Sequence, residues 1–185
     1  MKEKLPSFLA SKPGLLVACA LFNLLESKDR KIVVKSLQEP LKEMVVNKVA
    51  SLFLLHVVNT LDDTVMAKKK VINDILLTLD DNINDLTFQN IFLGMICPGS
   101  KRYFAQEDLD AFSALQEHST SKKDPETRRI ELLQAIVKPL EIFYEEKMQY
   151  YVSDIAKNPL LGKILASRIE LGDIDKSDAM DELFR

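Results

Sequence analysis

One kind of helix start recurs along this chain at nearly constant spacing, and this repeat constrains the fold more than any other feature. A polar residue and a lysine open an apolar helix at Lys12 and again at Lys48, 36 residues later. A third apolar helix begins at Leu86, after the capping residue Asp85, and the stretch around Lys157 resembles the first start about two periods further on. Spacings of this size, with two helices per repeat, are typical of α-solenoids. The sequence therefore predicts an all-α repeat array.

The clearest copy of the repeat is the stretch 47–70, NKVASLFLLHVVNTLDDTVMAKKK. After a polar cap at Asn47, large apolar side chains recur at i, i+4 and i+8, which is the pattern of a helix with one broad buried face. A short turn follows, and Asp63 or Thr64 can cap a second helix that carries three lysines. Across the copies we expect one continuous apolar seam, made by Val17, Leu21, Phe53, Val57 and Ile91.

Turn and cap signals divide the rest of the chain into further helices. We expect them over about 15–26, 30–45, 86–96, 107–115 and 125–150. Pro40 should end or bend the second of these, and Pro139 should bend the last. The predicted organisation has three parts: a lead-in over 1–10, a helical repeat array over 11–169, and an acidic tail over 170–185 that caps the array or is disordered.

Composition favours a folded helical protein. The hydrophobic fraction is 46% and the charged fraction 29%, and there are only five Gly and no Trp. No apolar run reaches the roughly 18 residues that a membrane span needs, and the N-terminus lacks the long apolar region of a signal peptide. Cys19 lies in an apolar helix pattern and is expected to be a small buried hydrophobe. We therefore expect an intracellular protein without membrane contact.

Catalytic and metal sites find little support in the sequence. No Gly-rich phosphate loop, HExxH, GxSxG or CxxC motif is present, and the two His and two Cys are all far apart. His56 falls within an apolar helix, where a packed histidine is the simpler interpretation. His118 lies in a polar loop and has no interaction partner nearby in the sequence. We expect no enzyme activity, no cofactor and no metal ion.

Several stretches resemble a known family. These are KDRK at 28–31, LDDTV at 61–65, and SKKD at 121–124 followed by the ExRRxELLxAI pattern over 126–136. Together with the helix starts they resemble the nucleolar pumilio-like proteins of the Puf-A type, over about residues 9–169, with their C-terminal Puf-like repeats and CPL domain. This resemblance implies a curved α-solenoid. It also implies RNA or DNA binding without a sequence code, in assembly of the large ribosomal subunit.

Base-reading Puf repeats place two polar side chains and a stacking side chain at fixed positions of one helix. Aligned to that pattern, the first two copies offer mostly apolar residues. They are Leu15, Leu16 and Cys19, then Ser51, Leu52 and Leu55. The third copy offers the amides Gln89 and Asn90 with Leu93, and the last offers Leu160, Leu161 and Ile164. Leucine cannot bond a base edge, so we expect no sequence-specific readout by this segment.

Basic residues near the helix starts are the candidates for phosphate contacts. They are Lys12, Lys28, Arg30, Lys31, Lys48, Lys68, Lys69, Lys70, Lys122, Lys123, Arg128 and Arg129. The same lysines and arginines can instead form an ordinary solvated face, in which some of them form ion pairs with nearby Asp and Glu residues. The net charge of −3 is also lower than that of a dedicated nucleic-acid domain.

The expected partners are pre-ribosomal RNA, or other structured RNA or DNA, together with ribosome assembly proteins. The expected protein is a monomer in the nucleus and nucleolus, taking part in ribosome biogenesis and rRNA processing. The alternative function is that of a protein-interaction scaffold that docks on assembly factors without touching RNA. The acidic overall charge favours that alternative, whereas the resemblance favours nucleic-acid binding.

Overall fold

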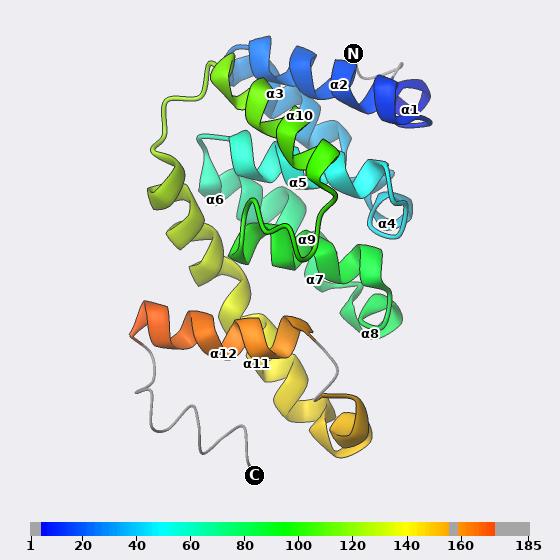
Figure 1. Ribbon diagram of the computed structural model, residues 1–185, viewed down its shortest axis with the longest axis vertical. Coiled ribbons are helices and arrows are strands. Elements are labelled where there is room, and N and C mark those ends of the chain that lie inside the picture. The colour runs from blue at the N-terminus through cyan, green and yellow to red at the C-terminus, as the bar shows by residue number, and fades with distance from the viewer. Residues whose placement is uncertain (1–4, 156–158, 173–185) are drawn as a thin grey trace.

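All regular elements of the described chain are helices (Figure 1). The computed structural model describes residues 5–155 and 159–172, and that part of the chain contains no strand. In chain order the elements are α1 (Leu5–Phe8), α2 (Lys12–Leu24), α3 (Ser27–Ser36), α4 (Leu41–Met44), α5 (Ala50–Thr60), α6 (Thr64–Ala67), the π-helix η2 (Lys68–Ile72), α7 (Asn73–Leu76), α8 (Leu79–Asn82), α9 (Leu86–Ile96), α10 (Gln106–Glu117), α11 (Pro125–Ile155) and α12 (Pro159–Leu171). The predicted all-α class is confirmed.

The helices stack in two rows, which is the arrangement of a helical repeat solenoid. The inner row consists of α2, α5, α9 and α12, and each of these helices packs against the next. The outer row consists of α3, the continuous helix formed by α6, η2 and α7, and α11, again packed in sequence. Successive repeats therefore present equivalent helices along the same side of the molecule.

Side-chain caps fix several helix starts where the sequence predicts them. The Ser11 hydroxyl accepts a hydrogen bond from the Gly14 N–H at 3.3 Å, and Asp63 and Asp85 each cap the helix that follows them. The Asn47 side chain accepts from the N–H of Ala50 at 3.0 Å, so it holds the start of α5, although regular helix begins only three residues later.

Pro40 and Pro139, each expected to end or bend a helix, have different effects in the structure. Helix α3 ends at Ser36, and Pro40 instead precedes α4, where its carbonyl accepts from the Met44 N–H at 3.1 Å. Pro139 lies inside α11, and the helix continues through it. The missing N–H of a proline costs a long helix one hydrogen bond, which packing on both sides of that turn can offset.

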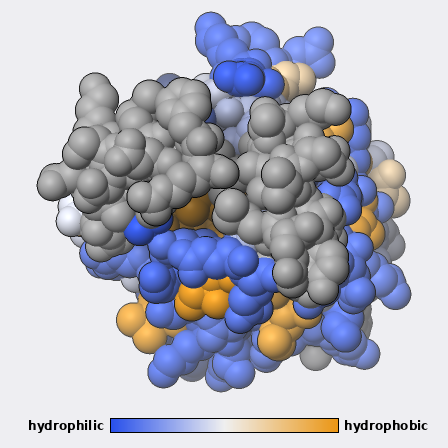
Figure 2. All heavy atoms as spheres, turned by 90° about the horizontal axis from the view of Figure 1, so that it is seen from below, coloured by the Kyte–Doolittle hydropathy of each residue, from blue (hydrophilic) through white to orange (hydrophobic). Residues whose placement is uncertain are grey.

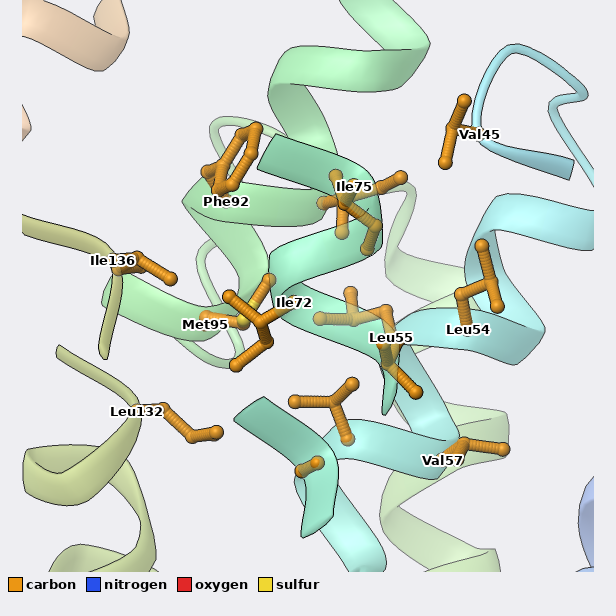
Figure 3. Close-up of a cluster of buried hydrophobic side chains, with 14 of the residues drawn as sticks. Val45, Leu54, Leu55, Val57, Ile72, Ile75, Phe92, Met95, Leu132 and Ile136 are labelled. Carbon is orange, nitrogen blue, oxygen red and sulfur yellow. The ribbon is translucent and has the colours of Figure 1, made fainter. Parts of the chain in front are cut away.

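The core runs through the junction of both rows, where α5, η2, α7, α9 and α11 meet (Figure 3). Leu54, Ile72, Phe92 and Leu132 point into this cluster from four different elements. Three residues of the expected seam, Phe53, Val57 and Ile91, are buried as predicted. The other two, Val17 and Leu21, were expected there wrongly: their side chains are 47% and 40% exposed.

The opposite face of α2 is the buried one. Its core residues are Leu15, Ala18, Cys19 and Phe22. Because α2 is apolar nearly all the way round, the spacing of large side chains cannot decide which face turns inward. The small Cys19 is fully buried, as expected, and burial raises the pKa of its thiol to about 12.

Helix α10 differs from the others because none of its residues is buried. It lies along α2, and in the view of Figure 1 it passes in front of the inner row, with α3 further from the viewer. Seen from the α12 end (Figure 2), hydrophilic side chains make up most of the visible described surface, with hydrophobic ones between them. The helix start expected at Lys157, and nearly all of the expected acidic tail, lie outside the described residues.

Candidate nucleic-acid interface

Arg30 lies inside the molecule, although it was expected at a phosphate-binding surface. It is 2% exposed, and its guanidinium donates to the carbonyl of Phe22 at 3.1 Å and to that of Asn23 at 2.7 Å. These carbonyls belong to the last turn of α2, where helix carbonyls lack intrahelical partners. Burial lowers the pKa of Arg30, opposed by the charge of Asp62. Arg30 is thus a structural cap for α2, which corrects its assignment as a phosphate contact.

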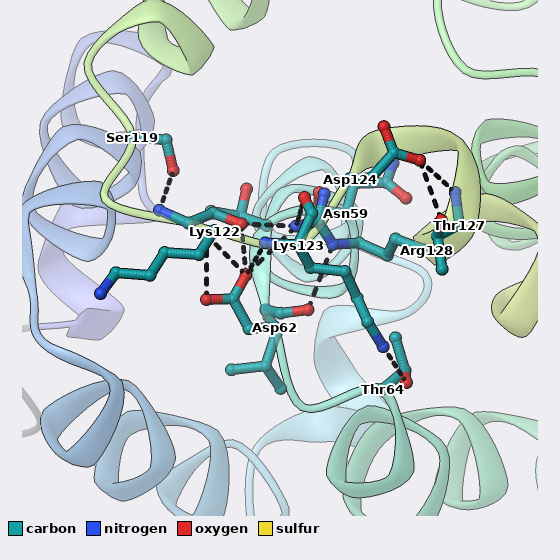
Figure 4. Close-up of polar contacts among 12 residues, drawn as sticks. Asn59, Asp62, Thr64, Ser119, Lys122, Lys123, Asp124, Thr127 and Arg128 are labelled. Carbon is teal, nitrogen blue, oxygen red and sulfur yellow. Dashed lines mark hydrogen bonds and ion pairs between the residues drawn. The ribbon is translucent and has the colours of Figure 1, made fainter.

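Arg128 is also buried, at the start of α11 (Figure 4). It is 4% exposed, and its guanidinium donates to the carbonyls of Asn59 at 2.9 Å and Leu61 at 3.2 Å. It also donates to Asp62, which follows α5. Burial lowers the pKa of Arg128, opposed by Asp62. This side chain joins α11 to the end of α5 and is not available to a phosphate, so its assignment is corrected as well.

The Asp62 carboxylate organises the loop between α10 and α11. It accepts hydrogen bonds from the Ser121 hydroxyl and from the main-chain N–H groups of Lys122 and Lys123, the latter two at 3.1 Å. Partial burial by itself would raise the pKa of Asp62. The hydrogen bonds and the charge of Arg128 outweigh burial and lower that pKa to about 2. The LDDTV and SKKD stretches therefore bind one another in the fold.

Four other candidates each have a carboxylate partner. The pairs are Lys12–Asp108, Lys31–Asp63, Lys123–Glu131, and Arg129 with both Glu126 and Glu170. Hydrogen bonding to Asp108 raises the pKa of Lys12, and hydrogen bonding to Glu126 and Glu170 raises that of Arg129. These side chains are at the surface, but a phosphate would have to compete with a carboxylate for each of them.

The remaining six candidates have no carboxylate partner among the described residues. They are Lys28, Lys48, Lys68, Lys69, Lys70 and Lys122. All are exposed except Lys70, which is half-buried. The three consecutive lysines occupy η2, a turn that is one residue wider than an α-helical turn.

Five of the predicted cations share one part of the outer row. Lys31 pairs with Asp63 at 2.7 Å, and Gln38 donates to Asp74 at 3.1 Å, so α3 and the α6–η2–α7 helix lie side by side in the same direction. We call the lysines of these two helices the outer basic face. Its members are Lys28, Lys31, Lys35, Lys68, Lys69 and Lys70. Lys35, exposed on α3, was not among the candidates from the sequence, because those were the basic residues near the expected helix starts.

The inner-row positions that were compared with base-reading residues are mostly covered. Leu15, Cys19, Leu55 and Leu93 are buried. Gln89 is buried too, and its amide N–H donates to the Ile83 carbonyl at 2.7 Å. Leu160 and Ile164 of the last copy and Ser51 of the second are buried as well, so packing removes six apolar positions, one serine and one of the two amides from the surface.

A cavity of about 480 Å³ lies beneath α10. We call it the α10 cavity. Its lining comes from α5, α9, the 97–105 connection, α10 and the start of α11. The apolar lining residues are Leu55, Gly94, Pro98, Phe104, Leu109, Phe112 and Pro125. Gly94 allows this close packing, because a Cβ there would come within 2.3 Å of the Leu55 side chain.

His56 connects α10 to the inner row, and sequence reasoning placed it correctly in the packed interior but without its partners. Its Nε2 lies 2.8 Å from the Asn23 side-chain oxygen, and its ring stacks on Phe112 at 5.6 Å between centroids. Since that oxygen can only accept, Nε2 carries the proton. Burial, and then the charge of Arg30, lower the pKa of His56 to about 4. The partners lie 33 and 56 residues away, beyond any local pattern.

The described residues form neither a metal-ion cluster nor a membrane-spanning helix. No group of three or more His, Cys, Asp or Glu side chains in that part of the chain is arranged to hold a metal ion. None of the helices described there is both long and apolar enough to cross a membrane.

The helices stack in two rows: the outer row carries the lysines, and the inner row carries the positions that correspond to base-reading residues. This arrangement defines a Puf-like helical repeat protein. The CPL (NUC119) domain family matches residues 84–185, and the chain belongs to that family.

Relatives and solved structures agree with this placement. Human Pumilio homolog 3 is 29% identical over 140 residues, which cover 76% of this chain and 22% of the relative. Pumilio homology domain family member 6 of Schizosaccharomyces pombe is 30% identical over 183 residues, 97% of this chain and 28% of the relative. The crystal structure of human Puf-A in complex with DNA matches with a TM-score of 0.80 and 26% identity, over 89% of this chain and 32% of that one.

The chain thus spans about a quarter of the length of the curated relatives that it matches. The resemblance to pumilio-like proteins of the Puf-A type, predicted from the KDRK, LDDTV and SKKD stretches, is confirmed.

Proposed function

We propose that this chain binds nucleic acid through the outer basic face, by contacts to the phosphate backbone. The observation that carries the proposal is the side-by-side placement of α3 and η2, where Lys28, Lys35, Lys68 and Lys69 are exposed and no carboxylate pairs with them among the described residues. Cations spaced along adjacent helices can follow a backbone without reading bases. The relative human Puf-A has been crystallised in complex with DNA, which supports a ligand of this class.

Binding by this face should depend little on base sequence. Apart from the half-buried amide of Asn90, the described side chains that would have to read base edges are apolar or buried, as Leu55, Gln89 and Leu93 illustrate. We expect affinities for unrelated RNAs of one length to differ by well under 100-fold, which corresponds to about 2.7 kcal/mol. A preference of that size for one RNA over scrambled controls would show that bases are read after all.

The test is a fluorescence-anisotropy titration with single-stranded and duplex RNA at two salt concentrations. Changing Lys68, Lys69 and Lys70 together to Glu should weaken both RNAs alike, and the logarithm of affinity should fall less steeply with that of salt concentration. The matched control makes the same charge change at three exposed cations outside the candidate set, Lys42, Lys101 and Arg102.

Two results would contradict the proposal. Unchanged RNA binding in the Lys68/Lys69/Lys70 variant, with its helical circular dichroism intact, would make those lysines a solvated face. An equal loss in the control variant would mean that net charge, and not this face, determines binding.

We further propose that the ligand in the cell is pre-ribosomal RNA or another structured nucleic acid. The chain would then act as a monomer in the nucleolus, with ribosome assembly proteins, in large-subunit biogenesis. Membership of the CPL (NUC119) family and the similarity to Pumilio homolog 3 support this role. Imaging of the tagged protein against a nucleolar marker, with precursor rRNA measured after depletion, tests it. A diffuse cytoplasmic signal with unchanged precursors would refute it.

A further inference from the structure

Helix α10 and the outer basic face carry opposite charge. Four of the twelve residues of α10 are acidic and none is basic: the acidic ones are Glu107, Asp108, Asp110 and Glu117. Only Asp108 of these pairs with a described cation, Lys12. The outer helix α3 carries four basic residues and one acidic residue over ten positions. A nucleic acid attracted by the outer basic face would be repelled at α10.

The apolar side of α10 is incompletely packed. Leu109 and Phe112 line the α10 cavity and remain half-exposed, and α10 contributes no fully buried side chain. The helix is nevertheless held in place: Lys12 binds Asp108 at 2.7 Å, and the Asn23 amide donates to the Leu115 carbonyl at 2.7 Å. The α10 cavity therefore lies beneath a helix that is tied to α2 at two points.

The size and lining of the α10 cavity fit side chains of a peptide. A volume of about 480 Å³ is in the range of cavities that enclose small ligands. Phe104 and Phe112 offer aromatic surface, and the side-chain amides of Asn59 and Gln116 also line the cavity. Of the three lining cations, Arg128 is paired with Asp62 and Arg129 with carboxylates, whereas Lys101 has no carboxylate partner among the described residues. The charge that α10 itself contributes is negative.

We propose that the α10 cavity and the acidic side of α10 form a docking site for a short basic peptide segment of a partner protein. An aromatic or aliphatic side chain of that segment enters the cavity, and flanking Lys or Arg residues face Glu107 and Asp110. Apolar anchors in a pocket supply most of the affinity in such interfaces, whereas the charges select the partner. This inference goes beyond nucleic-acid binding, because it assigns a protein ligand to a different surface.

Selection from a random twelve-residue peptide library displayed on phage tests this site. The immobilised full chain should enrich peptides with net positive charge and at least one large apolar residue. A synthetic copy of the most enriched peptide should bind in anisotropy measurements. Ser113→Trp places a large ring in the cavity from an exposed position of α10 and should weaken that peptide at least tenfold.

Matched controls separate the cavity from general effects. Ala114 is exposed on the same helix but does not line the cavity, so Ala114→Trp should leave peptide affinity unchanged. Changing Glu107 and Asp110 to Lys should weaken binding at least tenfold, whereas the same change at the exposed Glu39 and Glu43 should not.

Three outcomes would overturn the proposal: no enrichment above the bare matrix, enriched peptides that are acidic, or peptides that bind the Ser113→Trp variant as well as the unchanged protein. Displacement of the peptide by single-stranded RNA that depends on Ser113 would reassign the site to nucleic acid. Because the Lys68, Lys69 and Lys70 variant tests the outer basic face separately, each of the two proposals can fail alone.

Discussion

Arg128 and Asp62 hold the same short loop from two sides. Arg128 Nη2 lies 3.3 Å from Asp62 Oδ1 and 3.0 Å from the Lys123 carbonyl, while Asp62 accepts from the N–H groups of Lys122 and Lys123. The loop that leads from α10 to α11 is thereby fixed to the end of α5. Since α10 is held at its other end by the pair of Lys12 and Asp108, this network sets how α10 covers the inner row.

Replacing Arg128 should strongly destabilise the fold. Arg128→Met removes the donors for the carbonyls of Asn59 and Leu61 and leaves Asp62 without its charge partner, so the free energy of unfolding should fall by about 3–5 kcal/mol. Urea denaturation followed by circular dichroism measures this. Arg102→Met, at an exposed arginine, should change stability by less than about 0.5 kcal/mol. Equal effects of the two changes would mean that the network is not what stabilises the loop.

The two halves of the expected apolar seam should respond differently to truncation. Phe53 is fully buried and packs edge-to-face on Phe22 at 6.2 Å between ring centroids, so Phe53→Ala should cost about 3–5 kcal/mol. Val17 is 47% exposed, and Val17→Ala should cost less than about 0.5 kcal/mol. Thermal denaturation of both variants checks the difference, and a neutral Phe53→Ala would show that the helix faces are assigned incorrectly.

Stability should fall in mild acid because of His56. Its pKa is about 4 in the folded chain and about 6.5 when unfolded, so the unfolded chain binds a proton first as the pH drops. The free energy of unfolding should therefore decrease between pH 6.5 and 4, by on the order of 3 kcal/mol in total. Urea midpoints at several pH values in this window measure the slope. His56→Gln should flatten it, whereas His118→Gln, at an exposed position, should leave it unchanged.

The close approach of α1 to α2 should make Gly14 irreplaceable. A Cβ at Gly14 would lie 2.1 Å from the Phe8 carbonyl oxygen, which is main chain and cannot rotate away. Gly14→Ala should therefore destabilise the protein by about 1–3 kcal/mol, despite alanine's better helix propensity of about 1 kcal/mol. Increased amide exchange at Leu9, whose N–H bonds to the Leu5 carbonyl, would locate the damage. A stabilised variant would contradict this packing.

Local features of the fold were predictable because their causes are local. Asp63 and Asp85 cap the helices that follow them, as expected, because a capping side chain accepts a hydrogen bond from an N–H only three residues away. The face of α2 was not predictable, because a helix that is apolar all round takes its orientation from its neighbours. Arg30 was misplaced for a related reason: nothing in its own helix shows that it is buried against α2.

The candidate site also has parts that were predictable from the sequence and parts that were not. The lysines of η2 could be selected from sequence as a basic run, and the structure adds that α3 lies beside them. The α10 cavity had no sequence signal, because its walls come from five segments and α10 was recognised only as a short helix. Contacts such as that between His56 and Phe112, 56 residues apart, arise only when the repeats stack.

The wide turn of η2 has a consequence for insertions and deletions. The Asn73 N–H bonds to the Lys68 carbonyl, five residues back, so this turn holds one residue more than an α-helix needs. Loss of one lysine from the run would let the turn wind into an ordinary α-helix, with Thr64 and Ala67 before it and Ile75 after it keeping their buried faces. The chain can therefore lose a unit of positive charge here by deletion of a single codon, with little effect on the core.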